Sequence, residues 1–223
     1  ITNKGWEVIL DGTPVRTRNF QWEVGINFTA MESTVESLKE GIDDIGLNGF
    51  TSTSVDAVPG QPFSVIYGTG FQRSDAGDVI VGSDGYPLVD PTRQALGDPN
   101  PDWTLGFNNT FSFGNFSVGA LFDIRSGGDV WCGTCGIMNY FGTSKQSADE
   151  RDDVVVFEGV QNVGTDSEPI YETNETAVAL ADPNAGLGSY YRVRYGFGGI
   201  TEMNIYEASW VRLRNVSLGY TLP

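Results

Sequence analysis

Apolar and polar residues alternate with a period of two along several segments of the chain. One face of the segment from Phe20 to Phe28 holds Phe20, Trp22, Val24, Ile26 and Phe28, and the other holds Gln21, Glu23, Gly25 and Asn27. This period is typical of a β-strand with two different faces. A shorter alternation starts at Trp6, and Asp11-Gly12 and Pro14 after it indicate a turn. The patterns together predict strands over residues 5–11, 18–29, 103–113, 116–126 and 204–222.

Two of these strands are predicted to form a hairpin. Their apolar positions are Trp103, Leu105, Phe107, Phe111, Phe113, Phe116, Val118, Ala120, Phe122 and Ile124. Only Gly114 and Asn115 separate the two runs, and a two-residue loop makes its flanking residues, Phe113 and Phe116, pair and share a face. Glycine at the first loop position favours a type II′ turn.

The last strand changes phase once. Its apolar set is Val211 and Leu213, and then Val216, Leu218 and Tyr220, so the alternation slips by one residue near Asn215. A β-bulge inserts one extra residue into a strand and produces such a slip. The sequence therefore predicts a bulge at this point.

The alternation fits two architectures, a soluble sandwich and a transmembrane barrel. Strands of about ten residues match the length that crosses a bilayer, and Trp6, Trp22 and Trp103 lie where interfacial aromatic girdles form. Between the strands lie two long loops, 31–101 and 127–203, and a helix near Ser33–Glu36 is an alternative to extended chain in the first. Long loops of barrels lie outside the cell. A soluble or surface β-sandwich that binds carbohydrate or acts as an adhesin stays the alternative.

Composition excludes several function classes. The 223 residues hold 29 Gly, 13 Phe, 9 Tyr and 5 Trp but no His, and their formal charge of −16 argues against nucleic acid as a partner. No apolar run is long enough for a transmembrane helix. Without histidine the usual Ser-His and Cys-His routes are absent, so we expect no enzyme, no cofactor and no metal site. A secreted hydrolase that uses carboxylates is the competing class, but Asp43-Asp44 and Asp152-Asp153 are neighbours on loops.

The two cysteines, Cys132 and Cys135, are separated by two residues. A zinc site would need two further ligands of a kind that this chain lacks. A local disulfide in an oxidising, surface-exposed loop is favoured, with free thiols as the alternative.

Several motifs resemble one family. The closing segment from Tyr206 to Pro223, the Asn3-Lys4-Gly5 start with Thr13-Pro14-Val15, the Gly60–Gly68 element and Gly97–Trp103 are similar to those of SusC/RagA-type TonB-dependent outer-membrane transporters. Trp210 and Ser64 stand where that family usually has Tyr and Gly. The likeness is weakest between residues 127 and 200.

This resemblance implies an all-β fold: an incomplete C-terminal section of a large plugged antiparallel transmembrane β-barrel with long extracellular loops. It implies import of oligosaccharide or peptide nutrients together with a SusD-like surface lipoprotein. It also implies contact with outer-membrane lipid and with TonB, the latter through missing N-terminal regions. The expected location is the outer membrane of a Gram-negative, Bacteroidetes-like bacterium, and absent strands are expected to pair with the last one.

Two groups of candidate site residues follow. The polar faces of the strands would face the lumen and line a solute path, and carry Glu23, Asn27, Asn108, Asp123 and Arg125. The last long loop could contact a sugar or peptide through Tyr190, Tyr191, Arg192 and Arg194. Ser83-Asp84-Gly85 is interpreted as a turn in preference to a calcium loop.

Overall fold

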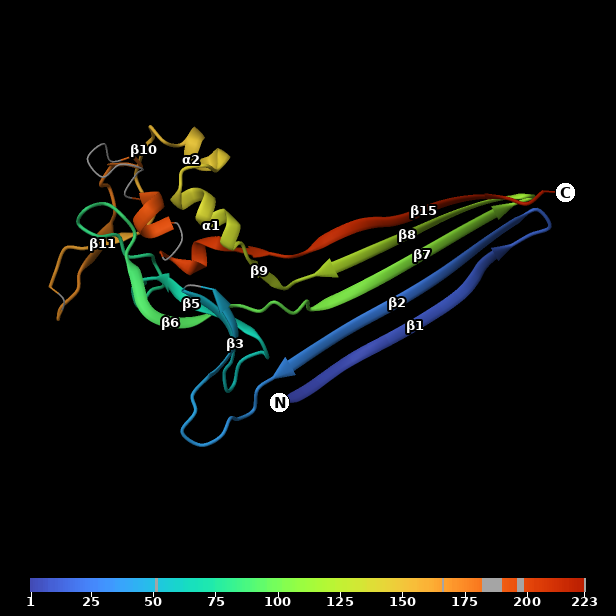
Figure 1. Cartoon of the computed structure of the whole chain (residues 1–223), viewed down its shortest axis with the longest axis horizontal. Helices are drawn as coiled ribbons and strands as arrows, with labels where there is room; N and C mark the ends of the chain where they lie inside the picture. The colour runs from blue at the N-terminus through green and yellow to red at the C-terminus, as the bar shows by residue number, and fades with distance from the viewer. Residues whose placement is uncertain (51, 166, 182–189, 196–198, 223) are drawn as a thin grey trace.

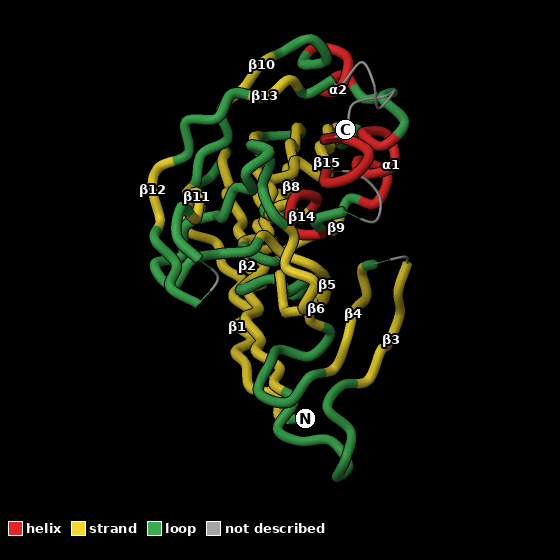
Figure 2. Tube along the Cα trace, turned by 90° about the vertical axis from the view of Figure 1, so that its left-hand side faces the viewer, coloured by secondary structure: helices red, strands yellow, loops and turns green. Residues whose placement is uncertain are grey.

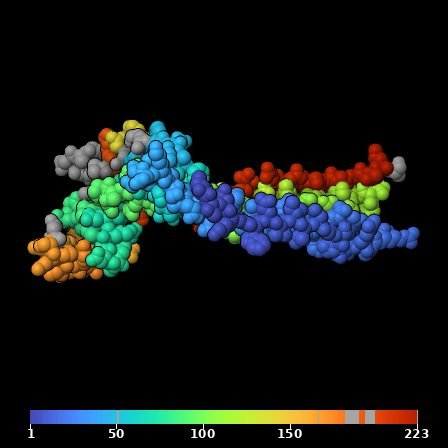
Figure 3. Space-filling model, turned by 90° about the horizontal axis from the view of Figure 1, so that it is seen from below, coloured from blue at the N-terminus to red at the C-terminus, as the bar shows by residue number. Residues whose placement is uncertain are grey.

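The structure, a computed structural model, describes residues 1–50, 52–165, 167–181, 190–195 and 199–222, with only the backbone described at 193–195. It has two parts: a long five-stranded sheet and a head at one end of that sheet (Figure 1). The tight connections between strands lie at the far end of the sheet, near the C-terminus. The sheet projects from the head as a thin slab (Figure 3).

The long sheet is antiparallel, with the strand order β1-β2-β7-β8-β15. Its strands are β1 (Thr2–Arg16), β2 (Phe20–Thr34), β7 (Trp103–Phe113), β8 (Phe116–Ser126) and β15 (Trp210–Tyr220). β1 runs through Asp11-Gly12 and Pro14, which the sequence indicated as a turn. A register shift between Gly12 and Val15 takes up the irregularity, so pairing with β2 continues on both sides.

The β7–β8 hairpin has the register that its sequence predicts. Phe113 pairs with Phe116, and the pairing continues without a shift to Trp103 and Ser126. Gly114 has a positive φ of 57°. Among the described residues, Ser64 is the one residue other than glycine with a positive φ, so the φ of Asn115 is negative. This combination confirms the type II′ turn.

The predicted bulge in the last strand is also confirmed. Leu213 pairs with Phe122 and Asn215 pairs with Leu121, so Arg214 is the extra residue on β15. The bulge restores the alternation after the phase slip. As a result Val211, Leu213 and Val216 all lie on the same face of the sheet.

That face is apolar from one edge of the sheet to the other, and many of its side chains are exposed. Successive cross-strand rows are Phe28-Leu105-Ile124-Val211, Ile26-Phe107-Phe122-Leu213, Val24-Asn109-Ala120-Val216, Trp22-Phe111-Val118-Leu218 and Phe20-Phe113-Phe116-Tyr220. Rings stack within and between these rows, as where Trp22 and Phe111 have centroids 5.9 Å apart.

Asn109 is the polar exception in these five rows. Its side chain is only 6% exposed, and its Oδ1 accepts a hydrogen bond of 3.1 Å from the indole Nε1–H of Trp22. A polar group in apolar surroundings needs such a partner. The pair joins residues 87 positions apart and ties β2 to β7 on the apolar face.

The head contains the rest of the regular structure. A four-stranded sheet is formed by β3 (Ile45–Phe50), β4 (Thr53–Ala57), β5 (Val65–Phe71) and β6 (Val89–Gly97), and the β3–β4 hairpin projects to one side (Figure 2). Three small ladders pair β9 (Asp129–Trp131) with β14 (Ile205–Glu207), β10 (Val154–Val155) with β13 (Val178–Ala179), and β11 (Val160–Asn162) with β12 (Tyr171–Thr173). The helices are α1 (Gly133–Tyr140), α2 (Lys145–Asp149), the π-helix η1 (Tyr190–Tyr195) and the 3-10 helix η2 (Thr201–Asn204).

The two segments expected as long loops therefore hold this head. Residues 35–44 form no helix, because the chain leaves β2 to make tertiary contacts. Val35 is fully buried, donates its N–H to the carbonyl of Gln61 and accepts from the N–H of Gly60. These distant backbone partners replace those that a helix would supply within itself.

A search of the described residues finds no helix that is both long enough and apolar enough to cross a membrane.

The first prediction concerns the Trp22–Asn109 hydrogen bond. Trp22→Phe removes the donor and leaves the amide oxygen of Asn109 unpaired, so we expect the free energy of unfolding to fall by about 1 kcal/mol. A double-variant cycle with Asn109→Leu isolates this coupling from the loss of ring area. The measurement is chemical unfolding of the natural protein in detergent micelles. Asn108→Leu, on the opposite face, is the matched control; equal coupling of Trp22 to both asparagines would contradict the assignment.

Candidate functional site

The five residues expected to face a lumen lie on one face of the sheet, opposite the apolar rows. Cross-strand pairing puts Asn27 and Asp123 on either side of Gly106 in one row. Because neighbouring strands are about 4.8 Å apart, these two side chains start about 10 Å from each other. Gly106 has no side chain, so a shallow gap separates them.

The other three expected residues occupy neighbouring rows. Asn108 pairs with Gly25 and Leu121, Glu23 pairs with Thr110, and Arg125 pairs with Thr104. Glu23 accepts a hydrogen bond of 2.7 Å from Gln21. Arg125 points toward the head, where it donates to the backbone carbonyls of Pro99 at 2.6 Å and Gly127 at 3.4 Å.

Asp123 has a partner that the sequence alone did not indicate. The guanidinium Nη1 of Arg214 donates to its Oδ2 at 2.5 Å. Arg214 is the bulged residue of β15, and the bulge turns its side chain to the polar face, which it shares with Arg212. The phase slip near Asn215 was the sequence signal for this placement.

Charge is distributed unevenly over the polar face. Its β1–β2 side carries the carboxylates Glu7, Asp11 and Glu23 and one basic group, Arg16. Its β8–β15 side carries the guanidinium groups Arg125, Arg212 and Arg214 and one carboxylate, Asp123. Arg212 also lies over the ring of Trp210, 4.7 Å from its centroid. The polar face is therefore net acidic toward β1 and net basic toward β15.

The expected ligand contacts of the last long loop are placed differently. Tyr190 and Tyr191 are 7% and 5% exposed and form a core cluster with Leu180, so they stabilise the head and do not present their rings at its surface. Apolar rings lose contact with water by packing in this way. Arg192 donates to the hydroxyl of Tyr140 and lies over its ring. The side chain of Arg194 falls outside the described residues.

Cys132 and Cys135 are joined by a disulfide at the start of α1. The backbone N–H of Cys132 donates to the carbonyl of Asn204 at 2.8 Å, which ties this turn to η2. Trp131, directly before the disulfide, pairs with Ile205 in the β9–β14 ladder. The start of α1 is thus held by a covalent link and by a strand pairing.

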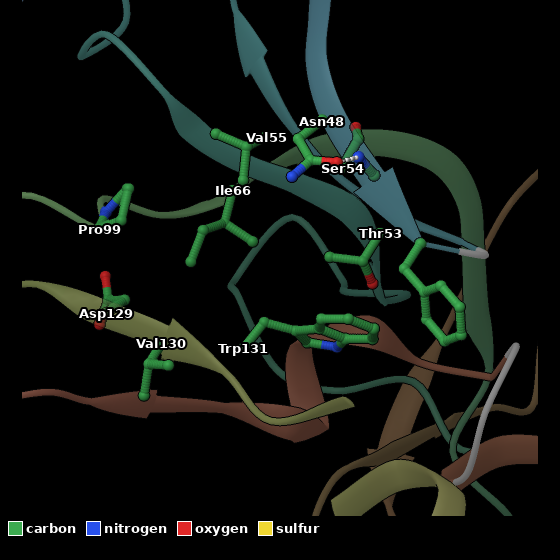
Figure 4. A pocket seen from close by; sticks show the side chains of 11 residues that line it. Asn48, Thr53, Ser54, Val55, Ile66, Pro99, Asp129, Val130 and Trp131 are labelled. Carbon is green, nitrogen blue, oxygen red and sulfur yellow. Dashed lines mark hydrogen bonds between the residues drawn. The ribbon is translucent and has the colours of Figure 1, made fainter. Parts of the chain in front are cut away.

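A cavity of about 290 Å³ lies between the β3–β4 hairpin and β9 (Figure 4). The rings of Phe50 and Trp131 form one end of it, with centroids 6.4 Å apart. Val55, Ile66 and Pro99 line its middle, and Asp129 lies at the other end, beside Pro99. Sequence reasoning missed this site, because β4, β5 and β9 meet only in the folded head.

The comparisons with known proteins agree with this architecture. No family model matches the chain. TonB-dependent receptor P3 of Formosa agariphila is 24% identical over a 247-residue alignment that covers the whole chain and 22% of the relative. TonB-dependent receptor P26 of the same organism is 29% identical over 153 residues, which cover 59% of the chain and 15% of the relative. The chain therefore spans less than a quarter of the length of these relatives.

A solved structure, that of the RagAB peptide transporter, has the same fold. It superposes with a TM-score of 0.58 at 17% identity, over 99% of this chain and 23% of the transporter chain. In the described part of this chain β1 and β15 are the two edges of the long sheet, so the sheet does not close on itself. The resemblance indicated by the sequence motifs is confirmed, and the chain has the fold of a section of a SusC/RagA-type TonB-dependent outer-membrane transporter barrel.

Proposed function

We propose that this chain forms part of the wall and extracellular mouth of an outer-membrane TonB-dependent transporter that imports oligosaccharide or peptide nutrients together with a SusD-like surface lipoprotein. The observation that carries the proposal is the register of the long sheet. It keeps an apolar face and a charged face apart across five strands. Lipid would cover the first face, and the lumen would lie against the second.

The height of the apolar face supports this assignment. A strand of 11 residues such as β7 rises about 36 Å along its own axis, and at a tilt of about 40° it spans about 28 Å. The apolar band of outer-membrane barrels is about 25 Å tall. Aromatic residues lie near both ends of the strands: Phe113, Phe116 and Tyr220 by the tight turn, and Trp6 and Trp103 toward the head.

The connections assign an orientation. Gly114-Asn115 and the short link between β1 and β2 lie at the end far from the head. Short turns of such barrels face the periplasm and long connections face outward, so the head would lie at the extracellular mouth. There it could meet incoming solute and a lipoprotein partner. The relatives' names support TonB as the source of energy, and the peptide transporter RagAB supports a nutrient of that kind.

The polar face is the proposed lumenal wall. Glu23, Asn27 and Asn108 would line the solute path or contact a plug. Asp123 is already paired with Arg214, and the contacts of Arg125 with the carbonyls of Pro99 and Gly127 join the wall to the head. We assign Arg125 a positioning role at the mouth.

The alternative, a β-sandwich, needs a second layer over the apolar face. In the described part of the chain, Val211, Val216 and Leu218 of β15 are exposed, and no second sheet covers them. Burial of such residues is what stabilises a sandwich. The structure therefore favours the membrane wall.

The second prediction tests which face meets lipid. Val216 lies in the middle row of the apolar face, and Ser217 beside it points to the opposite face. Val216→Arg should destabilise the barrel by about 2–4 kcal/mol, because a guanidinium near the bilayer midplane is costly. Ser217→Arg, the matched control, should have little effect. The measurement is the fraction of folded natural protein in outer membranes, read from heat-modifiable migration in gels; the opposite ranking would reverse the faces.

The third prediction concerns energised uptake. We expect the natural protein to fractionate with outer membranes and to be extracted only by detergent. Deletion of its gene should abolish growth on at least one oligosaccharide or peptide mixture, and so should loss of TonB or collapse of the proton-motive force in the wild type. Growth on free monosaccharides and amino acids is the control. A detergent-free, monomeric natural protein would support the sandwich instead.

A further inference from the structure

The cavity between Phe50 and Trp131 has the features of a built ligand site. We propose that it is a subsite for the N-terminal residue of a peptide: a large apolar side chain enters the aromatic end, and the α-ammonium group binds Asp129. This inference rests on the proposed import function, and it selects peptide over oligosaccharide as the substrate class.

Trp131 is held rigidly at the aromatic end. Its backbone pairs with Ile205, and the disulfide of Cys132 follows directly. Its ring lies against Gly133, where an added methyl group would be 2.7 Å from the indole. No larger residue fits at position 133 without moving the ring, so Gly133 permits the observed position of the Trp131 ring. A ring fixed before binding loses little entropy when a ligand stacks on it.

Phe50 offers a second ring beside Trp131, at the same end of the cavity. It is 56% exposed, although it belongs to a strand whose hairpin partner Thr53 is buried. The ring centroids are 6.4 Å apart and the planes are inclined at 51°, so the rings pack against each other and together form an apolar wall at this end. The volume of about 290 Å³ is near the lower limit of small-molecule sites, which suits one bulky side chain and the adjoining main chain.

The polar side chains around the cavity already have protein partners. Asn48 accepts from the N–H of Gly49, Thr53 donates to Thr201, and Ser54 accepts from Arg93. A buried sugar ring would need partners for each of its hydroxyl groups, and an unpaired hydroxyl is costly. An aliphatic or aromatic side chain makes no such demand. The lining therefore favours an apolar group over a pyranose.

The opposite end of the cavity is acidic. Asp129 uses Oδ2 to accept from the backbone N–H of Asp98, and a carboxylate retains further acceptor capacity after one such bond. Figure 4 shows the carboxylate of Asp129 at the Pro99 end, away from the ring of Trp131. The chain as a whole carries a formal charge of −16, which attracts cations to its surface. One apolar end and one anionic end match a free N-terminal residue with an apolar side chain.

The fourth prediction uses defined peptides as probes. The natural protein in detergent is titrated calorimetrically with Phe-Ala-Ala, Ser-Ala-Ala, N-acetyl-Phe-Ala-Ala and maltotriose. We expect Phe-Ala-Ala to bind about ten-fold more tightly than each of the other three, because each lacks the apolar ring or the ammonium group. Equal affinity for Phe-Ala-Ala and Ser-Ala-Ala would overturn the proposal. So would tighter binding of maltotriose.

Variants of the cavity residues test where Phe-Ala-Ala binds. Trp131→Ala and Val55→Trp, which fills the cavity from a partly exposed position, should each weaken Phe-Ala-Ala about ten-fold. Asp129→Asn keeps the acceptor for Asp98 and should weaken Phe-Ala-Ala but not its N-acetyl form. Phe141→Ala, an exposed ring outside the cavity lining, is the matched control and should bind normally. Unchanged affinity in both Trp131→Ala and Val55→Trp would place the peptide elsewhere.

Growth assays separate this proposal from the import function. If TonB-dependent growth is found while the affinity for Phe-Ala-Ala does not depend on Trp131, the transporter assignment stands and the subsite is wrong. If Phe-Ala-Ala binds through Trp131 and Asp129 but no nutrient shows TonB-dependent uptake, the subsite stands and the import function is wrong.

Discussion

Antiparallel backbone pairing across the long sheet is the constraint on which the other features depend. In a strand the side chains alternate, so a slip of one residue would move every apolar group to the charged face. Two bulges, between Gly12 and Val15 and between Leu213 and Asn215, keep the pairing in phase where the chain is irregular. Lipid could not solvate unpaired peptide groups, so the ladder must be continuous through the apolar band.

The same sheet positions the head. β8 passes into β9 after a short break, and β15 follows β14, so the β9–β14 ladder extends the pairing of β8 with β15 into the head. Arg125 adds contacts to two backbone carbonyls at this junction. The aromatic cavity includes β9, and its position relative to the wall is therefore set by the strands themselves.

The two faces of the sheet satisfy their polar groups in different ways. On the apolar face the amide of Asn109 is hydrogen-bonded to Trp22, because no water would be available there. On the opposite face Asp123 and Arg214 form an ion pair that remains partly exposed, and other charged groups lie nearby. Such a surface can exchange partners with solute or protein, whereas the apolar face cannot.

The sequence by itself determined the features that follow from local alternation. These are the two-faced strands, the Phe113–Phe116 hairpin register and the bulge near Asn215, and family motifs added the barrel class. Only the tertiary structure decided which distant residues meet: Trp22 with Asn109, Asp123 with Arg214, and Phe50 with Trp131. It also buried Tyr190 and Tyr191, which sequence reasoning had placed at a ligand surface. Such contacts depend on how separate strands and loops are brought together, and a period of two within one strand carries no information about that.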